Sequence, residues 1–200
     1  MNYGQIRAHF KALLNRSDIT DTLADTFLDQ GNARIQRSLR IPPMESQHSY
    51  SFTSQTTKVT LPADFLEAID LYFDNVSLIR LPMREMQAHL ASGETGSPVY
   101  FLREGGDLLL HPQPSSGNLV LNYYSIFAEL SADSDENILS EVAPDLIIYA
   151  ALTYAADYYL DDRAEIWTAK FFSFTEELRS QAVEQELSGQ LQQIRPAYSI

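Results

Sequence analysis

The sequence predicts an α+β protein: a helical bundle built from both ends of the chain, an inserted and mostly antiparallel β-unit, and an extended C-terminal arm. Helical periodicity is confined to the two ends, and short alternating runs separated by turn residues fill the middle. The order helices, strands, helices favours one bundle flanking an insertion over two sequential domains. The expected parts are residues 1–44 and 127–187 for the helical bundle, 45–126 for the β-domain and 188–200 for the arm.

Two helices are expected in the first forty residues. The apolar stripe of the first helix consists of Ile6, Phe10, Leu13 and Leu14. The second helix can begin after Asp18 or Thr20, either of which can cap its free N–H groups, and Pro42 ends it. Gly31 lies on the apolar stripe of this second helix, where the absence of a side chain would let a neighbour approach closely.

The middle of the chain has the composition of a β-domain. Runs rich in β-forming residues occur at 49–52, 58–61, 66–73, 77–81, 99–102, 107–111 and 119–125. Turn-forming residues separate several of these runs, including Asp74 with Asn75 and Gly105 with Gly106. A short helix is expected at 84–91. The pattern predicts a small sheet or a half-barrel.

Helices return towards the C-terminus. Pro144 suits the first turn of a helix, and 146–160 is apolar nearly all round, which predicts burial against its own bundle or against a neighbouring subunit. Asp161 or Asp162 can cap the helix that follows, and Gly189 can end it. The apolar stripe of that last helix consists of Trp167, Phe171, Phe174, Leu178 and Ala182.

Composition narrows the classes of function. The chain has no cysteine, which excludes a disulfide scaffold, thiolate zinc sites and a cysteine nucleophile. The net charge is -13, so specific binding to the phosphates of nucleic acid is not expected. The N-terminus lacks the pattern of a signal peptide, and the most apolar run, 146–156, is too short to cross a bilayer. We therefore expect a soluble protein with no membrane contact.

Residue patterns that carry chemistry are scarce. No nucleophile elbow, phosphate-binding loop or dinucleotide fingerprint occurs. The histidines lack metal-ligand spacing; they are His9, His48, His89 and His111. Paired carboxylates can hydrolyse glycosidic bonds, and the candidates are Glu67, Asp70, Asp157, Asp161, Asp162 and Glu165. Capping at a helix junction explains the last four of these carboxylates better. The sequence predicts no catalytic residue, no metal and no cofactor.

Four segments, taken in order, resemble the head–tail adaptor (connector) proteins of tailed bacteriophages. The resemblance covers about residues 20–185. The segments are the helix 23–40 ending in IQRSLR, VTLPADFLE at 59–67, GSPVYF through DLLLHPQP at 96–114, and APDLIIYAAL through WTAKF at 143–171. Each motif alone is weak, and their order and spacing carry the resemblance.

The resemblance implies a structural virion protein without catalytic residues. It implies a homo-oligomeric ring, commonly a dodecamer, in the neck between head and tail and assembled in the host cytoplasm. Its partners would be further copies of itself, the portal protein and a tail or nozzle protein, and DNA would pass through without specific binding. The helices at 144–160 and 163–187 are expected to supply flanks for the ring contacts. The arm would reach the portal, and its interface residues would be Arg195, Pro196, Tyr198 and Ile200.

Other functions stay open at this point. The sequence is also compatible with a different neck or tail-completion subunit of a phage. A virion-associated cell-wall hydrolase would use two of the carboxylates named above. A small ligand-binding β-module would leave the flanking helices without a role.

Overall fold

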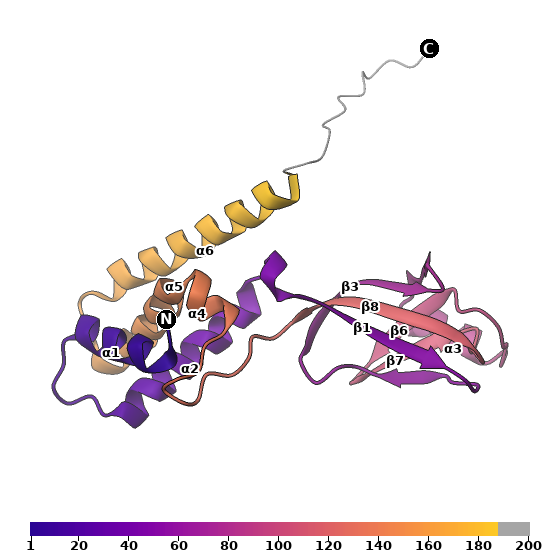
Figure 1. The fold of residues 1–200 in the computed structure, drawn as a ribbon, viewed down its shortest axis with the longest axis horizontal. Coiled ribbons are helices and arrows are strands. Elements are labelled where there is room, and N and C mark those ends of the chain that lie inside the picture. Colours follow the sequence, from indigo (N-terminus) through magenta and orange to yellow (C-terminus); the bar gives the residue numbers. More distant parts are fainter. Residues whose placement is uncertain (188–200) are drawn as a thin grey trace, which may run out of the picture. The chain divides into compact units, whose positions relative to one another are not determined.

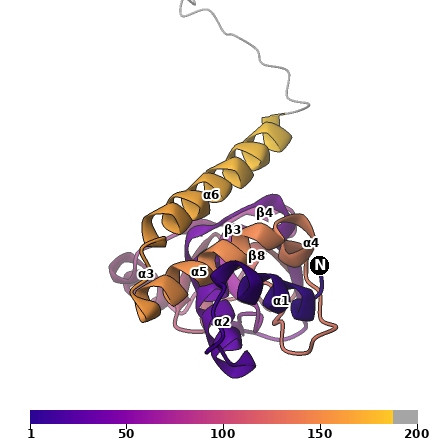
Figure 2. The ribbon, with the colours of Figure 1, turned by 90° about the vertical axis from the view of Figure 1, so that its left-hand side faces the viewer.

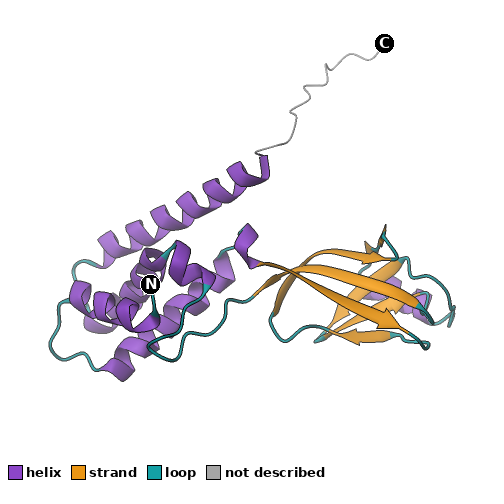
Figure 3. Cartoon of the chain, in the orientation of Figure 1, coloured by secondary structure: helices purple, strands orange, loops and turns teal. Residues whose placement is uncertain are grey.

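The structure of the protein, a computed structural model, describes residues 1–187. Contacts between residues divide the chain into a helical unit, Met1–Pro43 with the chain from Phe127 onward, and a β-unit, Met44–Ile126 (Figure 1). Figure 3 shows the first as helices joined by loops and the second as strands with one helix among them. The predicted α+β class is confirmed. The predicted arm, 188–200, lies outside the described residues.

The helical unit is built around one central helix. Its elements are α1 (Tyr3–Leu14), α2 (Asp21–Ser38), the short 3-10 helix η1 (Pro42–Met44) at its border, α4 (Ile138–Val142), α5 (Pro144–Tyr159) and α6 (Ala164–Leu187). Helix α5 packs against α1, α2, α4 and α6. In the end-on view of Figure 2, α6 lies on one side of α5, with α1 and α2 on the other.

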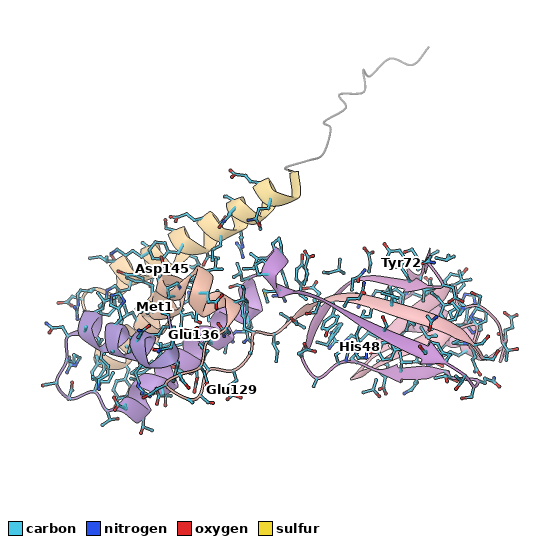
Figure 4. The ribbon with its side chains drawn as sticks, in the orientation of Figure 1. Met1, His48, Tyr72, Glu129, Glu136 and Asp145 are labelled. Carbon is cyan, nitrogen blue, oxygen red and sulfur yellow. The ribbon has the colours of Figure 1, made fainter. Side chains whose placement is uncertain are left out.

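Caps fix where the first helices begin. The Asn2 side chain accepts a hydrogen bond from the backbone N–H of Gln5 at 2.9 Å, and the Gln5 side chain accepts one from Asn2 in return. The hydroxyl of Thr20 accepts from the N–H of Leu23 at 3.2 Å, so Thr20 caps α2 rather than Asp18. The N-terminal ammonium of Met1 donates to the carbonyl of Ser140 in α4, and Figure 4 labels Met1 on the helical unit.

Helix α5 is buried by its own chain. Its buried residues are Leu146, Ile147, Ile148, Ala150, Ala151, Leu152, Ala155 and Ala156. The structure thus decides between the two expected forms of burial, in favour of the protein's own bundle. The buried residues of this helix are covered by α1, α2, α4 and α6 and so are not available for ring contacts, and the expectation of a ring flank stays a prediction for its remaining residues.

Gly31 marks the closest approach of α2 to α5. A Cβ atom at this position would lie 2.8 Å from the backbone nitrogen of Ala151 and 3.2 Å from the Cβ atom of Ala150. The predicted close approach at Gly31 is confirmed. Nearby, Arg34 donates to the Thr153 hydroxyl at 2.8 Å and lies over the ring of Phe171 at 4.3 Å, which ties α2 to both α5 and α6.

The β-unit contains two four-stranded sheets. Its elements are β1 (Glu45–Phe52), β2 (Lys58–Thr60), β3 (Phe65–Phe73), β4 (Val76–Ser77), β5 (Ile79–Arg80), α3 (Met83–Leu90), β6 (Tyr100–Glu104), β7 (Asp107–His111) and β8 (Gly117–Ser125). One sheet has the order β1-β8-β3-β4 and is antiparallel throughout. The other has the order β2-β7-β6-β5, in which only the β5–β6 pair is parallel.

Both sheets contribute to one core. Buried side chains from the first sheet, including Phe73 and Leu121, pack with Phe101 and Leu110 from the second. Helix α3 covers the other face of the second sheet, where Met86 is fully buried. The predicted single sheet or half-barrel is therefore replaced by two sheets that share a core.

The structure differs from the sequence prediction at one strand and adds one helix. The expected strand at 77–81 is split, because Leu78 turns into the shared core and the strands before and after it join different sheets. Helix α4, which was not predicted as a separate element, begins after Asn137, whose side chain accepts from the N–H of Ser140 at 2.8 Å. Helix α5 then begins at Pro144, as predicted.

No helix within residues 1–187 combines the length and apolarity that a bilayer crossing requires.

Candidate functional site

The four predicted interface residues are not placed by the structure. Arg195, Pro196, Tyr198 and Ile200 lie outside the described residues. Candidate contact surfaces must therefore be sought in residues 1–187, where large apolar side chains and unpaired charges reach the surface. One such surface stands out in the helical unit, and two unpaired arginines stand out in the β-unit.

Arg163 organises the turn between α5 and α6. Its guanidinium donates to the carbonyl of Leu14 at 2.9 Å and to that of Leu13 at 3.3 Å, so it binds the C-terminal end of α1. The same group forms two hydrogen bonds with the carboxylate of Asp161, at 2.9 and 2.7 Å, and lies 4.5 Å from the centre of the Trp167 ring. Asp161 also accepts from the backbone N–H of Arg163 at 2.9 Å, so it is the predicted capping residue that the turn uses.

Lowering the pH is expected to remove the stability that Asp161 contributes. The hydrogen bonds from Arg163 lower the pKa of Asp161 to about 2, against about 3.9 for a free aspartate. Because the folded-state value is the lower one, the stabilisation is complete above about pH 5 and is lost as the pH falls towards 2. Urea unfolding should show Asp161→Asn less stable than wild type by up to about 2 kcal/mol at pH 7. The difference should shrink between pH 5 and pH 2, and a constant difference would contradict the assignment.

The α5–α6 turn presents apolar and acidic side chains to solvent. Leu160 is 88% exposed and has a left-handed backbone with φ of 51°, a conformation that leucine rarely adopts. Tyr158 and Ile166 are also more than half exposed. Three exposed carboxylates close to them in the chain have no partner among the described residues. We call this surface the acidic corner; it consists of Asp157, Tyr158, Leu160, Asp162, Glu165 and Ile166.

Most basic side chains are held within the chain. Arg7 pairs with Asp25 and Asp133, and the other lysines and arginines of residues 1–187 likewise find carboxylates, carbonyls, hydroxyls or aromatic rings, with two exceptions. The exceptions are Arg80 and Arg84, which are exposed and have no partner among the described residues. In a chain of net charge -13, these two guanidinium groups remain available for another molecule.

The two free arginines lie in an exposed apolar setting. Arg80 is in the edge strand β5 and Arg84 is in the first turn of α3. Ile79 and Met83 are exposed next to them in the chain, and the backbone N–H of Ile79 donates to the carbonyl of Val99, which is also exposed, at 2.9 Å. The pairing of β5 with β6 sets Ile79 opposite Tyr100, on the face of the sheet that α3 covers, and Arg80 opposite Phe101, on the other face, so the two arginines do not belong to one surface.

The residues considered for chemistry are dispersed. Glu67 and Asp70 are exposed on β3. His89 and His111 are the two histidines that the fold brings together, with ring centres 5.3 Å apart and His111 buried. His48 lies on β1 beside Tyr50, and Figure 4 labels it on the β-unit with Tyr72. Within residues 1–187, no group of three or more histidine and carboxylate side chains is placed to hold a metal ion.

Comparison with known families gives a single assignment. The family model of the SU10 adaptor protein matches residues 1–195, nearly the whole chain. The chain belongs to the SU10 adaptor protein family. Membership agrees with the resemblance to phage head–tail adaptors and indicates a structural adaptor protein of a bacteriophage. No match was found among the curated proteins.

Sequence reasoning missed the exposed α5–α6 turn of this adaptor and its two unpaired arginines. Leu160 was placed at the end of an apolar helix expected to be buried, and neither Arg80 nor Arg84 was singled out. Leu160 stands directly before Asp161 and Asp162, and that abrupt change to acidic residues is a signal that the apolar run reaches the surface there. No comparable signal marks the arginines, because their lack of partners depends on the whole fold.

Proposed function

We propose that the protein is a head–tail adaptor that forms a homo-oligomeric ring in the virion neck, between the portal and the tail. The observation that carries this proposal is the match of the SU10 adaptor family to residues 1–195. The ring forms after synthesis in the host cytoplasm, and a dodecamer is the expected copy number. The ring surrounds the channel through which DNA passes.

Surface composition supports an assembly protein. Leu160, Ile166, Phe172 and Val183 are all more than half exposed on the helical unit, although their burial against another chain would be favourable. The net charge of -13 gives a ring whose walls repel the phosphates of DNA, so that the duplex slides without being held. The protein binds no cofactor and catalyses no reaction in this role. Asp161, weighed earlier as a hydrolytic carboxylate, is engaged by Arg163.

The C-terminal arm is the proposed portal contact. Tyr198 and Ile200 supply apolar anchors, and Arg195 supplies a charge that can pair with a carboxylate. Pro196 restricts the backbone of the segment and so lowers the entropy lost on binding. The opposite face of the ring then meets the tail or nozzle protein.

Mixing the full-length protein with the portal protein of the same phage tests both proposals. Negative-stain images should show rings seated on portals. Tyr198→Ala with Ile200→Ala should reduce portal binding about a hundredfold, the effect of losing two interface anchors. Gln192→Ala with Gln193→Ala is the matched control and should bind as wild type does. A wild-type protein that stays monomeric and ignores the portal would refute the adaptor assignment.

A further inference from the structure

We propose that residues 190–197 of the arm dock in a groove on the helical unit of their own chain, from which the portal must displace them. The docking stands apart from the proposed function, whereas the competition with the portal rests on it. The groove lies along the C-terminal half of α6, the helix that leads directly into the arm.

The groove consists of two adjoining hollows between α6 and the segment around α4, and the first hollow also reaches η1. Their volumes are about 130 and 160 Å³, and Val142, Leu178 and Gln181 line both of them. Val142 is 50% exposed, although it belongs to a helix that packs on α5. Since a cavity of roughly 150 Å³ takes a benzene-sized group, each hollow suits one branched apolar side chain.

The first hollow is largely apolar and the second is partly acidic. The residues that line the first hollow alone are Ile41, Pro42, Pro43, Ala182 and Gln185. The second hollow adds Phe174 and two carboxylates, Asp145 and Glu177, and Figure 4 labels Asp145 on the helical unit. The carboxylates accept hydrogen bonds from the N–H of Leu146 and the hydroxyl of Ser173, but neither forms an ion pair within residues 1–187. An apolar segment followed by a positive charge therefore complements the groove.

The sequence of the arm has this pattern. Its aliphatic residues recur at every third position: Leu191, Ile194, Ala197 and Ile200. A polyproline II chain has three residues per turn, so these side chains would form one face of it. Pro196 favours that conformation, both for itself and for the residue before it. Arg195 directly follows Ile194 and is the one charged side chain in the sequence 188–200.

The covalent link selects the arm as the occupant of the groove. Gln185 lines the first hollow and α6 ends at Leu187, so the arm begins beside that hollow. Gly189 can adopt the backbone angles that a reversal of the chain requires. A segment joined by a short link has an effective concentration in the millimolar range, which a separate partner of similar affinity rarely reaches.

The dimensions of the groove fit a segment that runs back along α6. From Gln185 to Phe174 the helix rises by roughly 17 Å, and from Leu191 to Ala197 a polyproline II chain spans about 19 Å. Leu191 would meet the apolar hollow first and Ile194 the second hollow. The Arg195 guanidinium would then pair with the carboxylates of the second hollow.

Docking would regulate the portal contact. Arg195 cannot pair with the groove and with the portal at the same time. The apparent affinity of the portal for the arm is therefore reduced by the fraction of arms that are docked.

Cysteine cross-linking of the full-length protein tests the docking, because the chain has no cysteine. One variant carries Gln193→Cys with Gln181→Cys, which would join the docked segment to the groove. The control carries Gln193→Cys with Ser180→Cys, since Ser180 is exposed beside Gln181 in the chain but lines neither hollow. A disulfide requires Cα atoms roughly 4–7 Å apart, so the first pair should close within one chain at least about tenfold faster than the control pair.

Two double substitutions show whether the aliphatic face holds the arm. Leu191→Ser with Ile194→Ser, added to the first cysteine pair, should slow the disulfide about tenfold, because the high effective concentration is lost. Gln190→Ser with Gln192→Ser is the matched control and should leave the rate unchanged. Both changes lie in the arm, so unfolding of the helical unit does not account for a difference. Equal rates for the Gln181 and Ser180 pairs, or disulfides that join two chains on a non-reducing gel, would overturn docking on the same chain.

Portal binding tests the competition. Without the cysteines, Leu191→Ser with Ile194→Ser should bind portal about tenfold more tightly than wild type, because the arm is no longer held in the groove. Gln190→Ser with Gln192→Ser should bind as wild type does. Unchanged or weaker binding by the first variant would overturn the competition. If wild type does not bind portal, the proposed function fails and the competition with it, while the cross-link still reports the docking.

Discussion

Replacing Gly31 with valine should destabilise the helical unit by about 3 kcal/mol, because overpacking forces side chains and backbone apart. The new Cβ atom would meet the backbone nitrogen of Ala151 at 2.8 Å, and backbone of a central helix cannot move aside as a flexible side chain can. Helix propensity favours valine over glycine by only a few tenths of a kcal/mol, so the clash decides that the free energy of unfolding falls. Circular dichroism at 222 nm should show Tm lowered by roughly 10 °C or more.

Gly106→Val is the matched control for this prediction. No atom lies within 4 Å of the position that its Cβ would occupy, and its backbone φ is not in the left-handed region. The control should change the stability by no more than about 0.5–1 kcal/mol, as surface substitutions do. Equal Tm values for the two variants would show that α2 and α5 do not pack at the distance described.

Replacing Arg163 with methionine should lower the free energy of unfolding by about 2–4 kcal/mol, because a largely buried carboxylate loses its partner. The Asp161 side chain is only 12% exposed, and the carbonyls of Leu13 and Leu14 lose their donor at the same time. Methionine preserves much of the apolar contact with Trp167, so the loss reports hydrogen bonds and charge. Urea unfolding at pH 7 measures it.

A second substitution separates charge from packing in this cluster. Asp161→Asn added to Arg163→Met removes the unpaired charge and should recover at least about 1 kcal/mol, since the remaining amide is less costly to leave unpaired. Arg103→Met is the control for the arginine change. Arg103 is exposed, lies over Phe65 and donates to the carbonyl of Gly105, but has no ion pair. Stability losses of similar size for Arg103→Met and Arg163→Met would contradict the role given to Asp161.

The sequence predicts the elements of this fold well where the determinants are local. The cap of α2, predicted at Asp18 or Thr20 and found at Thr20, the start of α5 at Pro144 and the turn at Gly105 follow from side-chain chemistry within a few residues of each position. Gly31 was identified by its place on an apolar stripe. These predictions hold because a helical turn or a tight turn is decided by neighbours in the chain.

The sequence predicts less well where partners come from far along the chain. The strands on either side of Leu78 belong to different sheets, and no residue between 76 and 80 indicates the change. The surroundings of α5 were left open because an apolar helix can be covered by its own chain or by another. Arg80 and Arg84 have no partner among the described residues because the fold brings no carboxylate within reach of them, and this depends on where every carboxylate of the chain lies.

The pairing of β1 with β8 has a consequence for how such proteins can diversify. Glu45 near the start of the β-unit stands opposite Tyr124 near its end, so the chain enters and leaves this unit through adjacent strands of one sheet. An inserted domain whose two ends are neighbours can be exchanged for a longer, shorter or unrelated one, because the helices before and after it are still joined over the same short distance. Recombination between phages could thus replace the β-unit as a cassette and leave the helices that precede and follow it untouched.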